Sequence, residues 1–378
     1  YMNKIRLNLF QLYCMLIILT LPLGVLTVPK LLIQSLGNNA WLAALTTIIP
    51  GILTIYIYFF IIRKSQQPFP LLLEEHLGLI AGKALGILYI FFFLLLSSRS
   101  LRTFIDFIET NVLPGTPISV LVGLMLILSL AAIKSGLNNF ARVMEIIVCI
   151  GYPFTLLVIT LAVEHSPDFY NLQPFGYMSY ASFAQGLYYS FLGVLNILPV
   201  LTLSYYANKP EHHFRTMFIV LISYVFLIML VTMAISVVLG GNTAKFFTFP
   251  TFNMVRLITL GEFIQNVDII FIGIWILGIF GVVTIWWFMA CYTIQAVFKL
   301  SDHRFLPAPT ALIVGVGSIA LSANIIELEI INRDILPLFN CFFLFIIPLL
   351  LFIITRFKSP VKSELETGKT GKITETRL

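Results

Sequence analysis

Four charged residues lie at helical spacing inside an apolar stretch of the chain. Arg99, Arg102, Asp106 and Glu109 are separated by three, four and three positions, which places their side chains on one face of a helix. Charged groups are costly in an apolar environment, so we expect them to point inward and to pair with one another. This face could be an ion-lined vestibule or gating network above a ligand pocket. It could equally be a structural ladder of Arg–Asp pairs that holds the helix against its neighbours, and the sequence leaves both open.

Proline and glycine interrupt two other apolar stretches in a matching way. The first contains Pro22, Gly24 and Pro29, and in the second Gly193 is followed by Pro199. Proline removes a backbone donor and clashes with the preceding turn, while glycine adds flexibility, so we expect both helices to be broken near their middle. Backbone groups released at such breaks must line a cavity or a ligand, because lipid cannot satisfy them. The matched pair predicts a binding site between the two helices; the alternative is two ordinary proline kinks.

The composition requires these helices to span a membrane. Of 378 residues, 59% are hydrophobic and 11% are charged, whereas soluble domains carry about a quarter charged residues. No strand-like alternation typical of a β-barrel is present. We therefore predict an all-α membrane domain, residues 1–358, with first and second repeats near 7–163 and 182–355 and a disordered cytoplasmic tail at 359–378. Ten spans of the length a bilayer needs are expected near residues 7–34, 41–62, 85–113, 117–133, 140–163, 182–206, 214–239, 266–298, 308–324 and 335–355.

The distribution of Lys and Arg predicts that both termini are cytoplasmic. Most of the 23 basic residues fall in the tail and in loops on the side of the N-terminus, leaving Lys245, Arg256 and Arg333 on the opposite side. The net charge of +6 is thus a topology signal, and we expect no nucleic-acid partner. Within the first span, we expect Lys30 to extend toward the interface rather than to pair. Short helices are also expected within Ser65–Gly82 and Asn253–Phe263, at the inner and outer interfaces.

Catalytic patterns are absent from the sequence. All five histidines fall in predicted loops, all four cysteines fall in apolar spans, and there is no phosphate-binding loop or nucleophile elbow. We therefore expect neither an enzyme nor a cofactor or metal site. Polar side chains that could face the pocket are few. They are Thr284, with Trp286, Trp287 and Tyr292 below it, in the eighth span, and Tyr188, Tyr189, Ser190 and Asn196 in the sixth. A pocket with so few charges favours a small zwitterion or a neutral ligand.

Several motifs taken together resemble the B subunits of endospore germinant receptors. They are Gly24–Lys30 (GVLTVPK), Thr116–Ile118 (TPI), Ser190–Gly193 (SFLG), Phe249–Thr251 (FPT) and Gly261–Trp275 (GEFIQNVDIIFIGIW). The resemblance extends from Leu7 to Phe357 and implies the fold of amino acid–polyamine–organocation transporters, in which two inverted repeats of five helices have their first helices broken at the midplane. It also implies a nutrient sensor in the inner spore membrane, in a complex with an A subunit and a C lipoprotein.

In that family the ligand lies among spans one, three, six and eight. The resemblance therefore implies a site at Gly24 and Val25 in the first span, Leu96 in the third, and Leu192, Gly193 and Val282 in the sixth and eighth. Pro22 and Thr284 join this set from the residue patterns alone. The sequence departs from the family where Pro22 replaces a second glycine that many members have. It departs again where Gln265 and Asn266 replace a Glu–Arg pair.

Three functions remain open, one of which is a channel or scaffold without a small-molecule site of its own. The first is a receptor subunit that binds a germinant, expected to be an amino acid, and triggers spore germination by shifting between two packings of the repeats. The second is a proton-coupled or facilitative amino-acid permease. Fold alone does not separate them, although no cluster of Asp, Ser and Thr suited to a coupling sodium ion is apparent.

Overall fold

Ten helical passes cross the molecule in a computed structural model that describes residues 7–64, 67–165, 167–173, 176–259 and 267–357. Seven segments of this described part are long and apolar enough to cross a membrane; one of them, 9–64, holds two passes, and two shorter apolar helices complete the ten. The passes are α1 (Leu9–Leu36), α2 (Ala40–Thr46) with α3 (Ile48–Lys64), α5 (Leu79–Asn111), α6 (Ile118–Lys134), α7 (Leu137–His165), α8 (Tyr180–Leu195) with α9 (Val200–Leu203), α10 (His213–Leu239), α13 (Val267–Phe298), α14 (Pro307–Ala320), and a last pass of α15 (Ile325–Ile330), η5 (Ile331–Ile335), α16 (Leu336–Cys341), η6 (Phe342–Ile346) and α17 (Ile347–Phe357).

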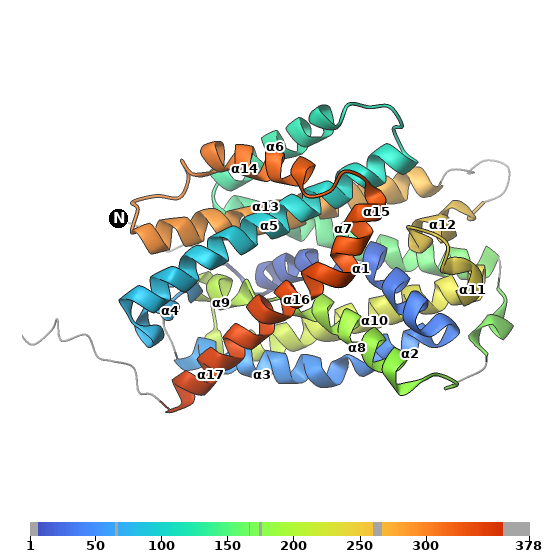
Figure 1. Cartoon of the computed structure of the whole chain (residues 1–378), viewed down its shortest axis with the longest axis horizontal. Coiled ribbons are helices and arrows are strands. Elements are labelled where there is room, and N and C mark those ends of the chain that lie inside the picture. Colours follow the sequence, from blue (N-terminus) through green and yellow to red (C-terminus); the bar gives the residue numbers. More distant parts are fainter. Residues whose placement is uncertain (1–6, 65–66, 166, 174–175, 260–266, 358–378) are drawn as a thin grey trace, which may run out of the picture.

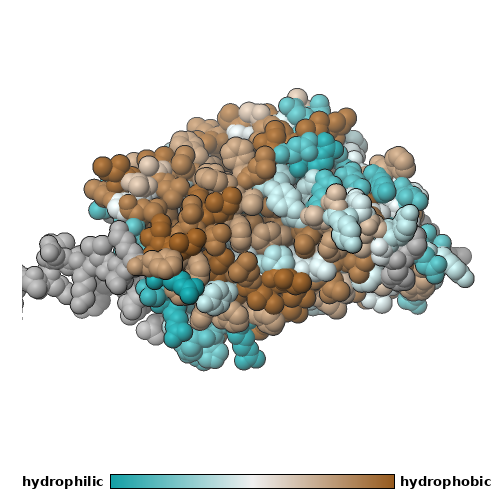
Figure 2. Space-filling view, turned by 60° about the horizontal axis from the view of Figure 1, so that its bottom comes forward, coloured by the Kyte–Doolittle hydropathy of each residue, from teal (hydrophilic) through white to brown (hydrophobic). Residues whose placement is uncertain are grey.

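Helix α1 lies at the centre and packs against α7, α8, α10 and α13. The short helices α4 (Phe69–Leu77) and α9 gather with the end of α17 at one end of the bundle (Figure 1), whereas α11 (Gly241–Ala244) and α12 (Pro250–Arg256) lie at the other. Figure 2 shows a broad hydrophobic surface across the middle of the visible face, with hydrophilic residues gathered toward its ends. This is the surface of a protein whose solvent is lipid.

The sixth span is broken as expected, but the first is not. Helix α8 ends at Leu195, four residues in turns follow, and α9 begins after Pro199. Helix α1, in contrast, is continuous through both Pro22 and Pro29, which corrects the prediction of a break there. The reason is that side chains of other helices donate hydrogen bonds to its backbone carbonyls. Pro29 cannot donate to the carbonyl of Val25, and that oxygen instead accepts a 2.6 Å hydrogen bond from the Thr251 hydroxyl of α12.

Thr251→Val should therefore destabilise the protein by about 1–3 kcal/mol, because it leaves a buried carbonyl without a donor. Thr251→Ser, which keeps the hydroxyl, is the matched control and should cost much less. Pro29→Ala restores the N–H that the Val25 carbonyl lacks, so it should rescue most of the loss in the Thr251→Val background. Thermal unfolding of these purified variants in detergent, each compared with its parent, measures this. A loss from Thr251→Val that is equally large with and without Pro29→Ala would contradict the assignment.

Prolines also shape the last pass. Its two π-helical segments, η5 and η6, end just before Pro337 and Pro348, and widened turns of this kind accommodate residues that cannot continue the normal hydrogen-bond ladder. The carbonyl of Leu344, four residues before Pro348, accepts a hydrogen bond from the Tyr58 hydroxyl of α3. The widened segment η5 also carries Asn332. The side-chain oxygen of Asn332 accepts a hydrogen bond from Arg99 of α5.

Three smaller expectations have mixed outcomes. Helix α4 lies within Ser65–Gly82 as predicted. Helix α12 begins at Pro250, earlier than the predicted Asn253, and ends at Arg256; the predicted continuation to Phe263 and the tail at 359–378 lie partly or wholly outside the described residues. Lys30 does not extend freely to the interface, because its ammonium forms an ion pair with Glu329 of α15. That pair ties the C-terminal half of α1 to the last pass.

Candidate ligand-binding site

A polar cavity lies beside the interruption of the sixth span. It is bounded by α1, α5, α8, α13 and the last pass, and its volume is about 60 Å³. Because a single water needs about 10–15 Å³ on the same scale, the cavity can hold a few waters or one small ligand. Its lining residues are Leu19, Leu23, Gly24, Thr27, Val28, Leu31, Arg99, Tyr189, Leu192, Gly193, Asn196, Trp286, Asn332, Leu336, Pro337 and Asn340.

Of the predicted ligand-binding residues, Gly24, Leu192 and Gly193 line this cavity. Of the other side chains expected near the pocket, Tyr189, Asn196 and Trp286 line it, whereas Tyr188, Ser190, Trp287 and Tyr292 do not. The sixth span therefore contributes Tyr189, Leu192, Gly193 and Asn196 to the cavity. The Asn196 amide donates to the carbonyl of Gly193 at 3.3 Å, so this side chain occupies one of the backbone groups near the helix interruption. Ser190, one turn before Gly193, is fully buried, and its hydroxyl has no hydrogen-bond partner among the described residues.

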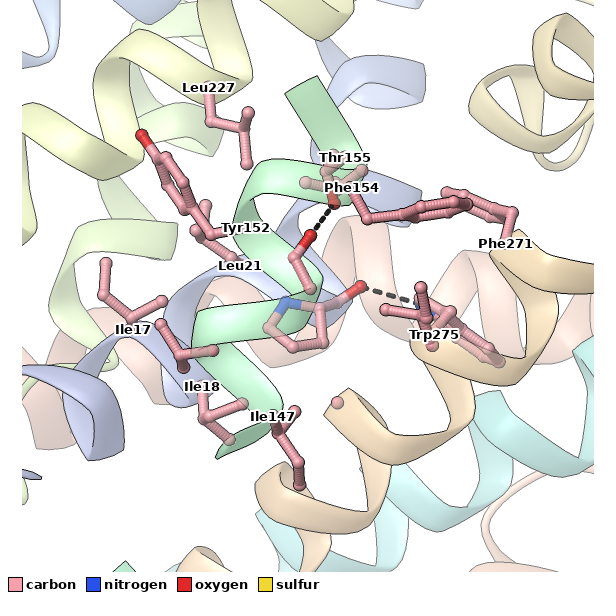
Figure 3. Close-up of a pocket in the computed structure, with 16 residues that line it drawn as sticks. Ile17, Ile18, Leu21, Ile147, Tyr152, Phe154, Thr155, Leu227, Phe271 and Trp275 are labelled. Carbon is pink, nitrogen blue, oxygen red and sulfur yellow. Dashed lines mark hydrogen bonds between the residues drawn. The ribbon is translucent and has the colours of Figure 1, made fainter. Parts of the chain in front are cut away.

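Pro22 and Val25 instead face a second cavity on another side of α1. This cavity is almost wholly apolar, has a volume of about 70 Å³, and lies between α1, α7, α10 and α13. Figure 3 shows Ile17, Ile18 and Leu21 of α1 on one side of it and Phe271 and Trp275 of α13 on another. The Trp275 indole N–H donates to the carbonyl of Pro22 at 2.9 Å. The predicted residues of the first span are thus divided between two cavities.

Leu96, Val282 and Thr284 line neither cavity and are fully buried between helices. The Thr284 hydroxyl is hydrogen-bonded to Ser129 of α6 at 2.9 Å and to the carbonyl of Phe280 at 2.6 Å, so it joins α13 to α6 on the side away from the polar cavity. Trp286, two residues further along, is the α13 residue at the cavity. Its ring stacks on Phe93 with 5.8 Å between ring centroids.

Gly24 and Gly193 face the same aromatic ring. Tyr224 of α10 donates its hydroxyl to the carbonyl of Ser190 at 3.0 Å. A Cβ atom on Gly193 would lie 2.0 Å from this hydroxyl, and one on Gly24 would lie 3.4 Å from the ring. The glycine of the sixth span is therefore required by the close approach of Tyr224, which lies against Gly24 of the first span as well as Gly193 of the sixth.

The charged face of the third span separates into two parts. Arg102 and Asp106 form a closed pair, with Nη2–Oδ1 at 3.0 Å and Nε–Oδ2 at 3.1 Å, and each side chain is only 4% exposed. Glu109 lies nearer the C-terminal end of α5 and is only half-buried. Arg99 points elsewhere: it lines the polar cavity and donates from Nε to the Asn332 side-chain oxygen at 2.7 Å. Its place at this cavity was not predicted.

The last pass contributes residues that the sequence interpretation missed. Asn332, Pro337 and Asn340 line the cavity, although the resemblance pointed only to spans one, three, six and eight. Asn340 is 6% exposed, and its side-chain oxygen has no hydrogen-bond partner in the described part of the chain. Two asparagines about two turns apart within an apolar span were the available signal, because an amide is expensive in lipid unless it faces a polar partner or a cavity.

Comparisons with known proteins agree with this architecture. A family model described as spore germination protein matches residues 6–326. Spore germination protein KB of Bacillus subtilis (strain 168) is 25% identical over 381 residues, which cover 98% of this chain and 100% of the relative.

Two solved transporter structures are also similar. Mhp1, a nucleobase-cation-symport-1 family transporter in a closed conformation with bromovinylhydantoin bound, superimposes with a TM-score of 0.68 at 10% identity, over 92% of this chain and 78% of that one. The manganese transporter of Eremococcus coleocola gives a TM-score of 0.53 at 13% identity, over 92% of this chain and 85% of that one. At such identities the likeness shows the fold alone, which is the helical fold that these two transporter structures share.

Proposed function

Because the chain belongs to the family of spore germination proteins, we propose that it is the membrane subunit of a nutrient receptor that binds a small germinant in the polar cavity. In this proposal the protein resides in the inner spore membrane with both termini in the cytoplasm. Its partners there are a receptor A subunit and a C lipoprotein. Binding of the germinant, expected to be an amino acid, is the event that starts germination.

The observation that carries the proposal is the position of the cavity. It is in contact with α1, α5, α8, α13 and the last pass at once, next to the interruption after Leu195. A ligand seated there contacts helices of both halves of the fold, so it favours whichever packing of the two halves closes best around it. A ligand shifts such an equilibrium only by its differential affinity for the two states. The ion pair of Lys30 with Glu329 joins α1 to the last pass on the outer side and is one contact that such a shift would change.

The second candidate is an amino-acid permease with the same cavity, which the fold of the neighbouring transporter structures favours. The two functions differ in whether the bound molecule leaves on the other side of the membrane. The sequence offers no evident coupling-sodium site. In the described part of the chain, the proline-released Val25 carbonyl of α1 is already occupied by the Thr251 hydroxyl.

Purified protein reconstituted in liposomes tests the choice. We expect a germinant from a panel of amino acids, sugars and nucleosides to raise the unfolding midpoint. At a ligand concentration of 100 Kd the stabilisation should be about 2.7 kcal/mol. The same radiolabelled compound should show no net uptake, with or without a proton gradient. Uptake above that of protein-free liposomes would favour the permease, and absence of stabilisation by every compound would count against a ligand site in this subunit.

A further inference from the structure

Arg99 is a cation at membrane depth that lacks an acidic partner. No carboxylate lies within 4.0 Å of its guanidinium among the described residues, and its one hydrogen bond there goes to the neutral amide of Asn332. Arg102, one turn away, already has Asp106 as a bidentate partner. Charged residues inside a membrane face the protein interior and pair, and those that do not pair within the protein mark ligand or ion sites. The guanidinium of Arg99 is therefore available to bind an anion that is not part of the chain.

The geometry favours a carboxylate as that anion. An arginine presents its donors in a planar fork that matches the two oxygens of a carboxylate. In Arg99 the Nε donor is held by Asn332 at 2.7 Å, which orients the plane of the guanidinium. Its two terminal nitrogens have no protein acceptor within the described ranges, and the residue lines the cavity. An oriented, unpaired guanidinium in a small cavity is a preorganised carboxylate receptor.

Asn340 supplies the complementary group. It lines the same cavity, it is 94% buried since its exposure is 6%, and its side-chain oxygen is an acceptor without a donor among the described residues. A buried acceptor left without a donor is destabilising, and this cost is recovered if a bound molecule donates a hydrogen bond. An ammonium group is the strongest such donor. The apolar residues Leu23, Val28 and Leu192 complete the lining.

We infer that Arg99 binds the carboxylate and Asn340 the ammonium of a small α-amino acid, so that the third and last spans recognise the zwitterion. The inference rests on the proposed function and names the ligand class of that same cavity. Gly24, Leu192 and Gly193 of the first and sixth spans line the same cavity and then enclose the rest of the ligand rather than its charges. Asn332 is a positioning residue, since it touches the guanidinium and orients it.

The test compares amino acids with analogues that lack one charge. Binding of the twenty amino acids, their α-amides and the corresponding carboxylic acids without the amino group is measured on the purified wild-type protein by thermal shift and calorimetry. We expect at least one amino acid to bind 10-fold or more tightly than its amide, because a hydrogen bond between two charged groups is stronger than one to a neutral amide. Equal affinity for the amide would overturn the role of a carboxylate in this site.

Variants assign the preference to residues. Arg99→Gln should lower affinity for the amino acid at least 10-fold and change affinity for the amide by less than threefold, and Asn340→Leu should lower affinity for the amino acid while sparing the deaminated acid. Arg333→Gln, on the exposed neighbour that pairs with Asp334, is the control and should leave both unchanged. Where Arg99→Gln does not fold, Arg99→Lys keeps the charge without the fork and should still weaken carboxylate binding. An Arg99 variant with unchanged amino-acid affinity would refute the inference.

The two proposals fail differently. If the protein bound only sugars or nucleosides, independently of Arg99, the inference of a zwitterion site would be contradicted, but the proposed receptor function would not. Binding of no compound in the panel would remove both.

Discussion

Asp106→Asn should lower the free energy of unfolding by about 3–5 kcal/mol, the cost of leaving one member of a buried ion pair without its partner. The carboxylate accepts from both the Nη2 and the Nε of Arg102 at 3.0 and 3.1 Å, and both side chains are 4% exposed. Asparagine keeps the shape of aspartate but removes the charge, which strands the guanidinium in the interior. The unfolding midpoint of purified protein and the yield of folded protein in membranes measure the loss.

Two double variants test whether stability depends on the presence of the two charges or on which residue carries each charge. Arg102→Met with Asp106→Leu removes both charges and should be far milder than either single change, since replacing a whole buried pair by apolar residues is often neutral. Arg102→Asp with Asp106→Arg reverses the pair and should recover much of the stability of the wild type. A reversed pair that folds and still responds to ligand supports a structural role. A reversed pair that folds but no longer responds would instead support the gating role that the sequence left open.

The sequence predicted that residues of the charged face pair with one another. It did not predict that Arg99 is separate from the Arg102–Asp106 pair and lines the cavity. Spacing of three and four residues along one helix is a local property, so the Arg102–Asp106 pair could be read from it. The partner of Arg99 is Asn332, 233 positions away, and no local pattern indicates which helix of a bundle faces a given side chain. For that reason Arg99 was grouped with its neighbours in sequence rather than with the cavity.

The first span shows a second limit of the same kind. Two prolines and a glycine indicate that the helix loses hydrogen bonds, and this part of the prediction is sound. Whether the helix then opens depends on whether other groups replace those bonds. Thr251, 226 positions from Val25, replaces one of them. From Gly193 to Pro199 the sixth span has only one glycine and one proline, yet it does break at Asn196. The outcome is therefore decided by tertiary contacts rather than by the number of prolines and glycines.

The fold class, in contrast, follows from composition and length. Apolar stretches of about 20 residues have one stable arrangement in lipid, and their number and order were readable without any tertiary information. Within the candidate site, the glycines could be identified as special positions. The reason for them could not, because a glycine motif does not say whether a ligand or a neighbouring side chain needs the space.

Gly193→Ala should destabilise the protein by about 3 kcal/mol, at the upper end of the range for overpacking a core. The new Cβ would lie 2.0 Å from the hydroxyl of Tyr224 and 2.6 Å from the adjoining ring carbon. The ring must move, and with it goes the 3.0 Å hydrogen bond to the carbonyl of Ser190. Thermal unfolding of the purified variant measures the loss, and ligand affinity measured in parallel shows how far the cavity wall has shifted.

Matched glycines make the result specific to this contact. Gly24→Ala places a Cβ at an ordinary contact distance of 3.4 Å from the same ring, and Gly273→Ala on α13 meets nothing within 4 Å; both should be near neutral or slightly stabilising, since alanine favours a helix by about 1 kcal/mol over glycine. In a Tyr224→Leu background the cost of Gly193→Ala should shrink, because the atoms it strikes are gone. An unchanged cost there would show that Gly193 is needed for the ligand or the helix interruption rather than for Tyr224. Loss of ligand response at Gly193 can therefore be assigned to the site only after the Tyr224 background has been measured.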